Sequence, residues 1–339
     1  MARATVFPGI SLVTSSGGPP ELAEAARLAE EAGFASVWAT EFYDRSATVA
    51  LAAMAQATST IELGSAIAYA FGRTPLVLAA EARDLDELSG GRITLGLGTG
   101  TQRMQQDWHG LDGLHSAPRM EELVPLLRRL WQMDSAPMRH DGRFYRLHLN
   151  PTAPPRAAHR ERIPIFMAGV NARMVEAAGA VADGLVGHPL FTVEYVREVV
   201  RPALARGAAR AGRAQPPPIA GYLTCSVGPD RAQVRAAAAA VIAFNSTVKT
   251  YRATHEVGGF TRESETIRAA WREGDFAGMT DAVSDEMIDA IALAGTPEEV
   301  RARFAERWQG VYERTLLWPP AFAGPEAVRA ALETFRSIG

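Results

Sequence analysis

The sequence of 339 residues contains one cysteine and one lysine, and both scarcities limit its chemistry. Cys225 has no second cysteine with which to form an intramolecular disulfide, and a cysteine-rich zinc or iron–sulfur site is excluded for the same reason. A reducing, cytoplasmic setting fits this composition. Any Schiff-base mechanism would have to use Lys249.

An excess of basic residues is also missing, because 35 Lys and Arg stand against 38 Asp and Glu. A nucleic-acid binder usually carries a basic face, so binding to a phosphate backbone is not expected. No stretch approaches the roughly 18 apolar residues of a membrane span, and residues 1–14 lack the basic start and apolar run of an export signal. We therefore expect a soluble, cytoplasmic protein without nucleic-acid or membrane partners.

Short β-rich runs instead alternate with amphipathic helical stretches along the whole chain. The predicted strands are 6–13, 36–40, 61–68, 93–98, 163–168, 184–186, 219–227 and 315–318. Eight such units favour an α/β fold of the (β/α)8 TIM-barrel type over a doubly wound sheet, and no Gly-x-Gly-x-x-Gly follows the first strand. We expect one domain over 1–339, with insertions at about 132–162, which includes a hairpin, and at about 245–293.

In such barrels the chemistry lies at the carboxyl ends of the strands. Thr40 and Glu41 follow the second predicted strand. A carboxylate there can accept a hydrogen bond from a ring N–H or act as a general base if burial raises its pKa. The alternative is a structural acid that pairs with an arginine such as Arg45.

Small residues end the third and fourth predicted strands. The run 64–66 would let backbone approach a ligand, although it could equally relieve crowding inside the barrel. The run Leu95–Gly100 lacks the Gly-Lys-Ser/Thr of a P-loop, so an NTPase is rejected. Its alternating glycines suit a flat ring lying against exposed backbone, which makes Gly98, Thr99 and Gly100 candidate cofactor contacts.

The fifth predicted strand runs directly into a helix through Gly169, Val170 and Asn171. Unpaired amide N–H groups and the positive end of the helix dipole converge there, so an anionic group would bind without a basic side chain. The alternative is an Asn171 N-cap with no further role.

None of the seven histidines forms a His-x-x-His or His-Glu-x-x-His pair, so no metal site is expected. His188 lies just beyond the sixth predicted strand and is a candidate proton donor or acceptor, unless it is only solvated. His109, after the fourth strand, is a second candidate. We expect the other five on the surface. No Gly-x-Ser-x-Gly elbow is present, and Cys225 lies within an apolar strand, so hydrolysis by a Ser or Cys triad has no support.

Several of these segments together resemble the bacterial luciferase-like monooxygenase superfamily. The likeness spans nearly the whole chain, and the Ser-Gly-Gly-Arg segment before Leu-Gly-Leu-Gly is its most specific part. It is carried by 61–67, Arg73-Thr74-Pro75 and 84–100. Within the superfamily, 40–44, Gly187-His188-Pro189 and 200–204 resemble the branch that uses the deazaflavin coenzyme F420.

The resemblance implies a barrel with an insertion and a cofactor ring against a bulge after the third strand, often with a non-proline cis peptide. On this chain the bulge maps to Ser65, Ala66 and Ile67, with Thr99 and Gly100 nearby and the phosphate side near 169–171. Where the sugar-phosphate dehydrogenases of that branch carry an Asp-His pair, this chain has Glu41-Phe42, and their acid after the fourth strand is replaced by Thr101. A glucose-6-phosphate type of activity is therefore not expected.

Our leading hypothesis is an oxidoreductase that passes a hydride between F420 and a small organic substrate, with Glu41 and His188 acting at the ring and His109 shaping the pocket. The alternative is a two-component monooxygenase that takes reduced FMN from a separate reductase. A non-catalytic flavin-binding homologue and a barrel lyase rank third. We also expect a homodimer.

Overall fold

A computed structural model describes residues 9–336 of the chain. Its strands are β1 (Ile10–Thr14), β2 (Ser36–Ala39), β3 (Glu62–Ser65), β4 (Ala68–Tyr69), β5 (Ile93–Gly98), β6 (Met138–Asp141), β7 (Arg146–Leu149), β8 (Ile165–Ala168), β9 (Gly184–Val186), β10 (Ile219–Val227), β11 (Ala292–Gly295) and β12 (Arg314–Trp318). Its α-helices are α1 (Pro19–Glu31), α2 (Ala47–Ala57), α3 (Pro75–Leu88), α4 (Gln102–His109), α5 (Ser116–Trp131), α6 (Ala172–Val181), α7 (Val193–Tyr195), α8 (Arg201–Arg210), α9 (Arg231–Ser246), α10 (Arg252–Gly258), α11 (Thr261–Glu273), α12 (Phe276–Asp281), α13 (Asp285–Ile291), α14 (Pro297–Arg303) and α15 (Gly324–Phe335).

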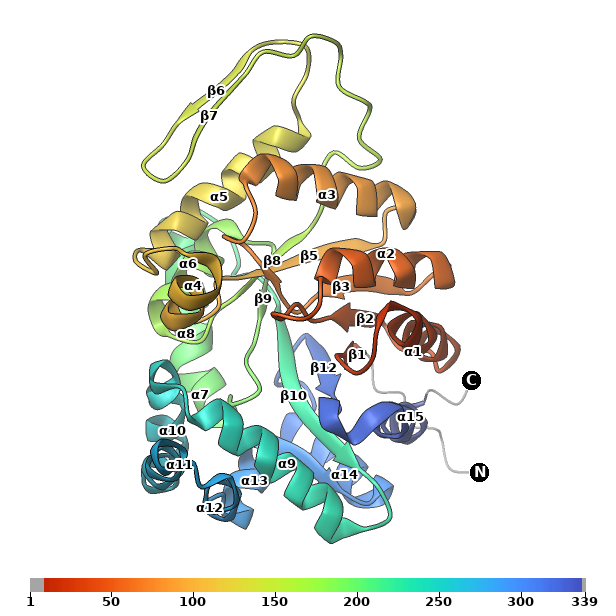
Figure 1. Ribbon diagram of the computed structural model, residues 1–339, viewed down its shortest axis with the longest axis vertical. Helices are drawn as coiled ribbons and strands as arrows, with labels where there is room; N and C mark the ends of the chain where they lie inside the picture. Colours follow the sequence, from red (N-terminus) through yellow and green to blue (C-terminus); the bar gives the residue numbers. More distant parts are fainter. Residues whose placement is uncertain (1–8, 337–339) are drawn as a thin grey trace.

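Eight parallel strands close into a barrel, as the alternation predicts. The pairing runs β1, β2, β3, β5, β8, β9, β10, β12 and returns to β1. β4 continues the β3 edge along β5, and β11 lies along the carboxyl half of β10. Helices surround the strands (Figure 1). The (β/α)8 prediction is confirmed, and it places the carboxyl ends of neighbouring strands on one rim.

The barrel is filled on both faces of its sheet. Inside it, Trp38 is fully buried among Val13, Val186, Tyr222 and Leu316. A larger apolar layer joins the outer face of the sheet to the helices. All nine residues of β10 are buried, which is why it reads as a continuous apolar run rather than an alternating one.

The predicted strand boundaries agree best with the structure where the apolar runs are continuous. β5, β9 and β10 have the predicted bounds, and the part of the first predicted strand before residue 9 lies outside the described residues. Two elements were not predicted. α4 buries only Gln105 and so shows no apolar stripe, and β11 is a four-residue strand at the end of the second insertion.

The first insertion carries the predicted hairpin, β6 and β7, which projects beyond α5 at the top of Figure 1. Glu122 on α5 holds its turn, because its carboxylate accepts hydrogen bonds from the backbone N–H groups of Phe144 and Tyr145 and contacts His140 at 2.9 Å. Arg119 and Arg129 of the same helix also donate to the hairpin, at the Tyr145 hydroxyl and the carbonyl of Arg139, so α5 fixes the hairpin to the barrel.

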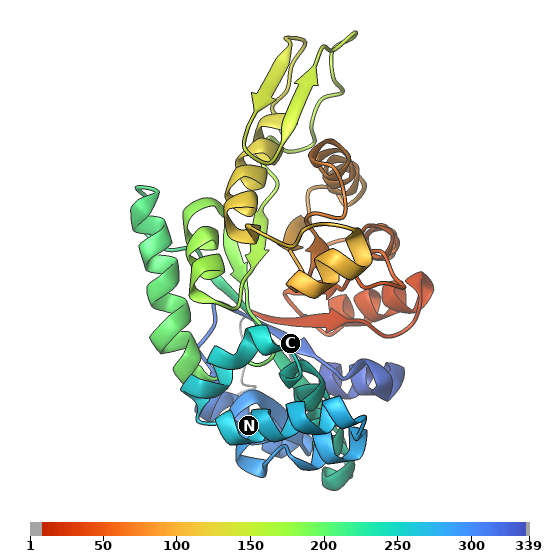
Figure 2. The ribbon, with the colours of Figure 1, turned by 60° about the vertical axis from the view of Figure 1, so that its left-hand side comes forward.

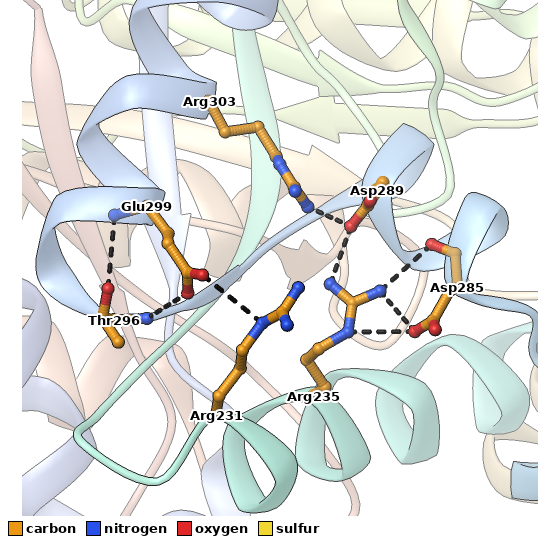
Figure 3. Close-up of polar contacts among 7 residues, drawn as sticks. All are labelled: Arg231, Arg235, Asp285, Asp289, Thr296, Glu299 and Arg303. Carbon is orange, nitrogen blue, oxygen red and sulfur yellow. Dashed lines mark hydrogen bonds and ion pairs between the residues drawn. The ribbon is translucent and has the colours of Figure 1, made fainter.

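The second insertion is mainly helical, and its residues Ile267, Met279 and Met287 share one apolar cluster with α9 of the barrel. Its helices α10 to α12 come forward in Figure 2. Ion pairs attach its last helix to the barrel (Figure 3): Arg235 on α9 binds Asp285 and Asp289 on α13, and Asp289 also binds Arg303 on α14. The insertion is therefore held at its base by charge and at its centre by apolar contact.

No helix within 9–336 is long and apolar enough to cross a membrane. The same residues contain no group of three His, Cys, Asp or Glu side chains placed to hold a metal ion.

Candidate functional site at the carboxyl ends of the strands

A bulge interrupts the edge formed by β3 and β4. Leu63 pairs with Ile93 and Ala68 pairs with Leu97, so this edge advances five positions while β5 advances four. The extra residue falls at Ala66–Ile67, where the peptide bond is cis. The resemblance implies both features at this place, and both are present. The bulge lies just beyond β3, at the rim where the strands end.

The glycines of β5 make room for this bulge. A Cβ atom on Gly96 would lie 1.7 Å from the carbonyl oxygen of Ser65, and one on Gly98 would lie 2.6 Å from Cγ1 of Ile67. The Ser65 hydroxyl donates to the carbonyl of Gly96 and accepts from its N–H, at 2.8 and 2.9 Å. The space beside Gly96 and Gly98 is therefore filled by Ser65 and Ile67 of the bulge. Both hydrogen bonds of the Ser65 hydroxyl are made within the protein.

Glu41 holds the far side of the bulge. Its Oε1 accepts from Arg73 at 2.6 Å, and its Oε2 accepts from Arg73 at 3.0 Å and from the backbone N–H of Tyr69 at 2.7 Å. Its own N–H donates to the carbonyl of Ile67. The partner is Arg73 rather than Arg45, which donates to the carbonyl of Ser15. Both carboxylate oxygens are thus engaged, and Glu41 positions the bulge.

Tyr69 connects three of the predicted site residues. Its N–H binds Glu41, its ring lies against the backbone of Gly100, and it meets the ring of His109 edge-on at 5.0 Å. Burial, and then the Glu41 carboxylate, raise the pKa of Tyr69, so its hydroxyl stays protonated. His109 also lies beside Gly72, and its Nε2 is buried without a partner in the described chain.

Thr40 and Thr99 flank this group at the ends of β2 and β5. Both are partly buried, and the Thr99 hydroxyl donates to the carbonyl of Gly100 at 2.9 Å. Gly100 has a φ of +64°, which favours glycine. Thr101 then caps α4 through the N–H of Met104. The four loops after β2, β3, β4 and β5 therefore form one continuous rim.

The start of α6 is open at the end of β8. Asn171 is the N-cap residue by position, but its side chain makes no capping hydrogen bond. Gly169 lies close against the first turn of the helix, because a Cβ atom on it would lie 3.1 Å from the backbone N of Val175. The carbonyl of Val170 accepts a hydrogen bond from the Tyr195 hydroxyl. The first amides of α6 thus have no side-chain acceptor, which suits an anionic group.

His188 lies apart from these groups, after β9. Its Nδ1 accepts from the N–H of Leu190 at 3.2 Å, and its ring contacts that of Tyr251 at 4.1 Å between centroids. Burial, and secondarily His255, lower the pKa of His188 to about 3. The ring is therefore neutral near pH 7, and its proton is on Nε2, because Nδ1 already accepts a hydrogen bond.

Exposed aromatic side chains stand on the rim beside Tyr69. Phe42, Tyr43 and Trp108 are 37%, 75% and 40% exposed. Trp108 meets Phe42 edge-on at 5.1 Å and Tyr43 edge-on at 5.7 Å. Large aromatic surface left open beside polar groups is typical of binding sites.

Sequence reasoning missed three residues that shape this face. Arg73, 32 positions beyond Glu41, gave no sign of pairing with it. Tyr251 and His255 lie in the second insertion. The prediction that His255 is on the surface is wrong, because it is 1% exposed. Its neighbours Thr254 and Glu256 are polar, and no local pattern marks the buried face of so short a helix.

Comparisons with known proteins agree with this architecture. A sequence profile of the luciferase-like monooxygenase family matches residues 5–314. An uncharacterised protein of Mycobacterium bovis is 34% identical, covering 94% of this chain and 96% of the relative. A 5,10-methylenetetrahydromethanopterin reductase of Methanolobus tindarius is 30% identical, covering 84% and 86%. The coenzyme F420-dependent tetrahydromethanopterin reductase of Methanopyrus kandleri superposes with a TM-score of 0.80 at 25% identity, covering 99% of each chain.

Proposed function

Because the chain belongs to the luciferase-like monooxygenase family, we propose that it is an oxidoreductase that transfers a hydride between coenzyme F420 and a small organic substrate. The similarity over most of its length to reductases, one of them named as F420-dependent, favours F420 over FMN. When bound, the deazaflavin supplies the hydride chemistry, and the protein supplies binding, orientation and exclusion of water.

The observation that carries the proposal is the bulge at Ala66–Ile67. It lies at the carboxyl end of β3, where Ser65 and Ala66 are small and buried, and it is fixed from behind by Gly96 and Gly98 and from the side by Glu41. A planar ring needs such a flat and rigid wall, because side chains at that point would keep it away from the backbone. We assign the wall to Ser65, Ala66 and Ile67, with Thr40, Thr99 and Gly100 along its edge.

The phosphate side of the cofactor would lie at Gly169, Val170 and Asn171. No side chain caps the first turn of α6, so its amide donors and dipole are free to face an anionic group. Glu41 acts here as a positioning residue, because its two oxygens are committed to Arg73 and Tyr69.

His188 would contact the substrate. As a neutral imidazole with its proton on Nε2, it can donate a hydrogen bond to a carbonyl or hydroxyl oxygen. The exposed rings of Phe42, Tyr43 and Trp108 offer an apolar wall on the opposite part of the rim. His109 would support that wall through Tyr69.

The test is to titrate the pure protein with oxidised F420 and, separately, with FMN, following ring absorbance and fluorescence. We expect saturable binding of F420 with a dissociation constant in the micromolar range or below and at least tenfold weaker binding of FMN, a difference of about 1.4 kcal/mol. Tight binding of FMN alone would contradict the proposal and favour the second candidate.

That second candidate is a two-component monooxygenase that uses reduced FMN and O2 and depends on a separate reductase. The description of the family as monooxygenases is the observation in its favour. Oxygen uptake with reduced FMN and a generic reductase would identify it, while binding of neither ring would indicate a homologue without flavin function.

A further inference from the structure

Buried side-chain nitrogens without hydrogen-bond partners lie on the helices of the second insertion, close to the loop that carries His188. His255 on α10 is 1% exposed, and both of its ring nitrogens are buried with no hydrogen-bond partner in the described chain. A buried polar group without a partner costs about 1–3 kcal/mol, so such a group calls for an explanation.

Arg268 on α11 is the second member. Its guanidinium makes no ion pair or hydrogen bond with any residue of 9–336, and its Nη1 is buried. Its charge lowers the pKa of His255, as does burial, which is the larger cause. The two residues lie on α10 and α11, which pack on each other, and the N–H of Phe260 just before α11 donates to the carbonyl of His255.

His188 is the third member, and it connects the cluster to the rim. Its ring lies against Tyr251, which directly precedes α10, and His255 lies close enough to lower its pKa. α10 packs on α7. A Cβ atom on Gly258 of α10 would lie only 3.0 Å from the side chain of Thr192, the N-cap residue of α7. The three side chains thus come from the loop after β9 and from two helices of the insertion that pack on each other and on α7.

The acids on neighbouring elements face other partners. Glu256 pairs with Arg252 at 2.6 Å, Glu194 pairs with Arg307 at 3.2 Å, and Glu263 accepts from Ser284 at 3.5 Å. Glu265 is exposed. Among residues 9–336, the nearby acids are thus engaged elsewhere or exposed, which leaves the Arg268 guanidinium without a counter-charge and disfavours a cation at this place.

We propose that Arg268, His255 and His188 form an anion subsite, which binds a carboxylate or phosphate group of the substrate. This inference rests on the proposed function and narrows its substrate class to small anionic molecules. The anion would approach the cluster from the side of the mouth, where His188 lies, and would accept hydrogen bonds from the imidazoles and the guanidinium. The first amides of α6 remain for the cofactor.

The test uses inorganic phosphate as the probe and needs no cofactor. The full-length protein, with its histidines labelled with 13C, is titrated with phosphate at constant ionic strength, and the ring signals are followed by NMR. We expect saturable shifts of the His255 and His188 signals, and no saturable shift of exposed His159.

Substitutions of two arginines on α11 test whether phosphate binds at Arg268. Arg268→Gln should weaken phosphate binding about tenfold or more, as expected for a lost charge-assisted hydrogen bond, and Arg268→Lys should restore part of it. Arg262→Gln removes the same charge from an exposed position of the same helix and should change binding less than about twofold. Equal losses in Arg268→Gln and Arg262→Gln, or unshifted His255 signals, would overturn the proposal.

A final titration separates the two sources of the anion. Phosphate affinity measured with and without saturating oxidised F420 should be the same, because substrate and cofactor bind together. Displacement of phosphate by F420 would show that the cofactor's own anionic group uses the cluster, and would overturn the assignment to substrate. Failure of F420 to bind at all contradicts the proposed function but leaves the phosphate result intact.

Discussion

Glu41 and Arg73 form a two-pronged ion pair beside the bulge, and the same carboxylate accepts the N–H of Tyr69. The pair is largely buried, with 9% and 16% of the two side chains exposed. It therefore links the loop after β2 to the strand edge that would face the cofactor ring.

Glu41→Gln and Arg73→Met should each destabilise the protein and weaken F420 binding. Each change breaks a charge-assisted contact worth about 1.5–3 kcal/mol. Because the residues act together, the double variant should lose much less than the sum of the single losses. Urea unfolding and F420 titration of all four proteins form the double-mutant cycle. Fully additive losses would argue against a shared role.

Gly96→Ala should damage the site more than Gly98→Ala. The new methyl group at 96 meets a backbone oxygen, whereas at 98 it meets a side chain that can move. We expect about 1–3 kcal/mol of destabilisation and tenfold weaker F420 binding for Gly98→Ala, measured by unfolding and ring titration.

The double variant Gly98→Ala with Ile67→Ala is the matched control for that experiment. Removing Cγ1 of Ile67 makes room for the new methyl group, so part of the lost stability should return. No recovery would show that Ile67 is not what the glycine accommodates.

Acid should destabilise the fold through His188 and His255. Burial lowers their pKa values from the ordinary 6.5 to about 3 and about 4. The unfolded chain therefore binds more protons below pH 6.5, and stability present above 6.5 is lost as the pH falls toward 4, by at most about 1.4 kcal/mol per pH unit for each histidine.

His255→Gln isolates this effect from the titration of carboxylates. The stability difference between the unsubstituted protein and the variant should fall by roughly 2 kcal/mol between pH 7 and pH 5 in phosphate-free buffer, measured by urea unfolding. His159→Gln, an exposed change, should show no such dependence. Parallel pH curves for all three proteins would contradict the assignment.

Arg235→Ala should loosen the attachment of the second insertion. The arginine is 12% exposed and connects α9 to Asp285 and Asp289 of α13. We expect a loss of about 1 kcal/mol, since ion pairs at the surface contribute little singly and more in networks. Hydrogen exchange should quicken in α13. Arg103→Ala, whose partner Asp107 is on the same exposed helix, should change stability by less than about 0.5 kcal/mol.

We propose that the outer face of α2 and α3 binds a second copy of the chain. Leu76 and Val77 at the start of α3 are 41% and 47% exposed, and Val49 on α2 and Leu88 at the opposite end of α3 are also exposed. Leu76→Glu with Val77→Glu should convert a dimer to a monomer in sedimentation experiments. Leu114→Glu, on an exposed loop, should not. A chain that is monomeric without any substitution would contradict the proposal.

The barrel itself could be predicted because continuous apolar runs such as β10 are long enough to mark buried parallel strands. The Ser-Gly-Gly-Arg segment has a structural role. Gly90 and Gly91 have positive φ, and Arg92 donates hydrogen bonds to the carbonyls of Ala55, Thr58 and Ile61. It joins α3 to β5 and closes the end of α2.

The partners of the site residues could not be predicted from the sequence. The nearest arginine after Glu41 is Arg45, but closure of the barrel brings Arg73 to it from the next loop. His255 depends on the packing of α10 against α7 and α11, which no single helix pattern contains. Contacts of this kind arise from tertiary structure, whereas local periodicity reports only which face of an element is apolar.

The lone lysine offers a practical consequence. Lys249 is exposed in a short helical turn, Lys249–Tyr251, whose last residue lies against the His188 ring. An amine-reactive fluorophore would therefore find one lysine side chain to label, two residues before the tyrosine that contacts His188. Its emission would report arrival of a ligand in real time, without engineering a cysteine into the protein.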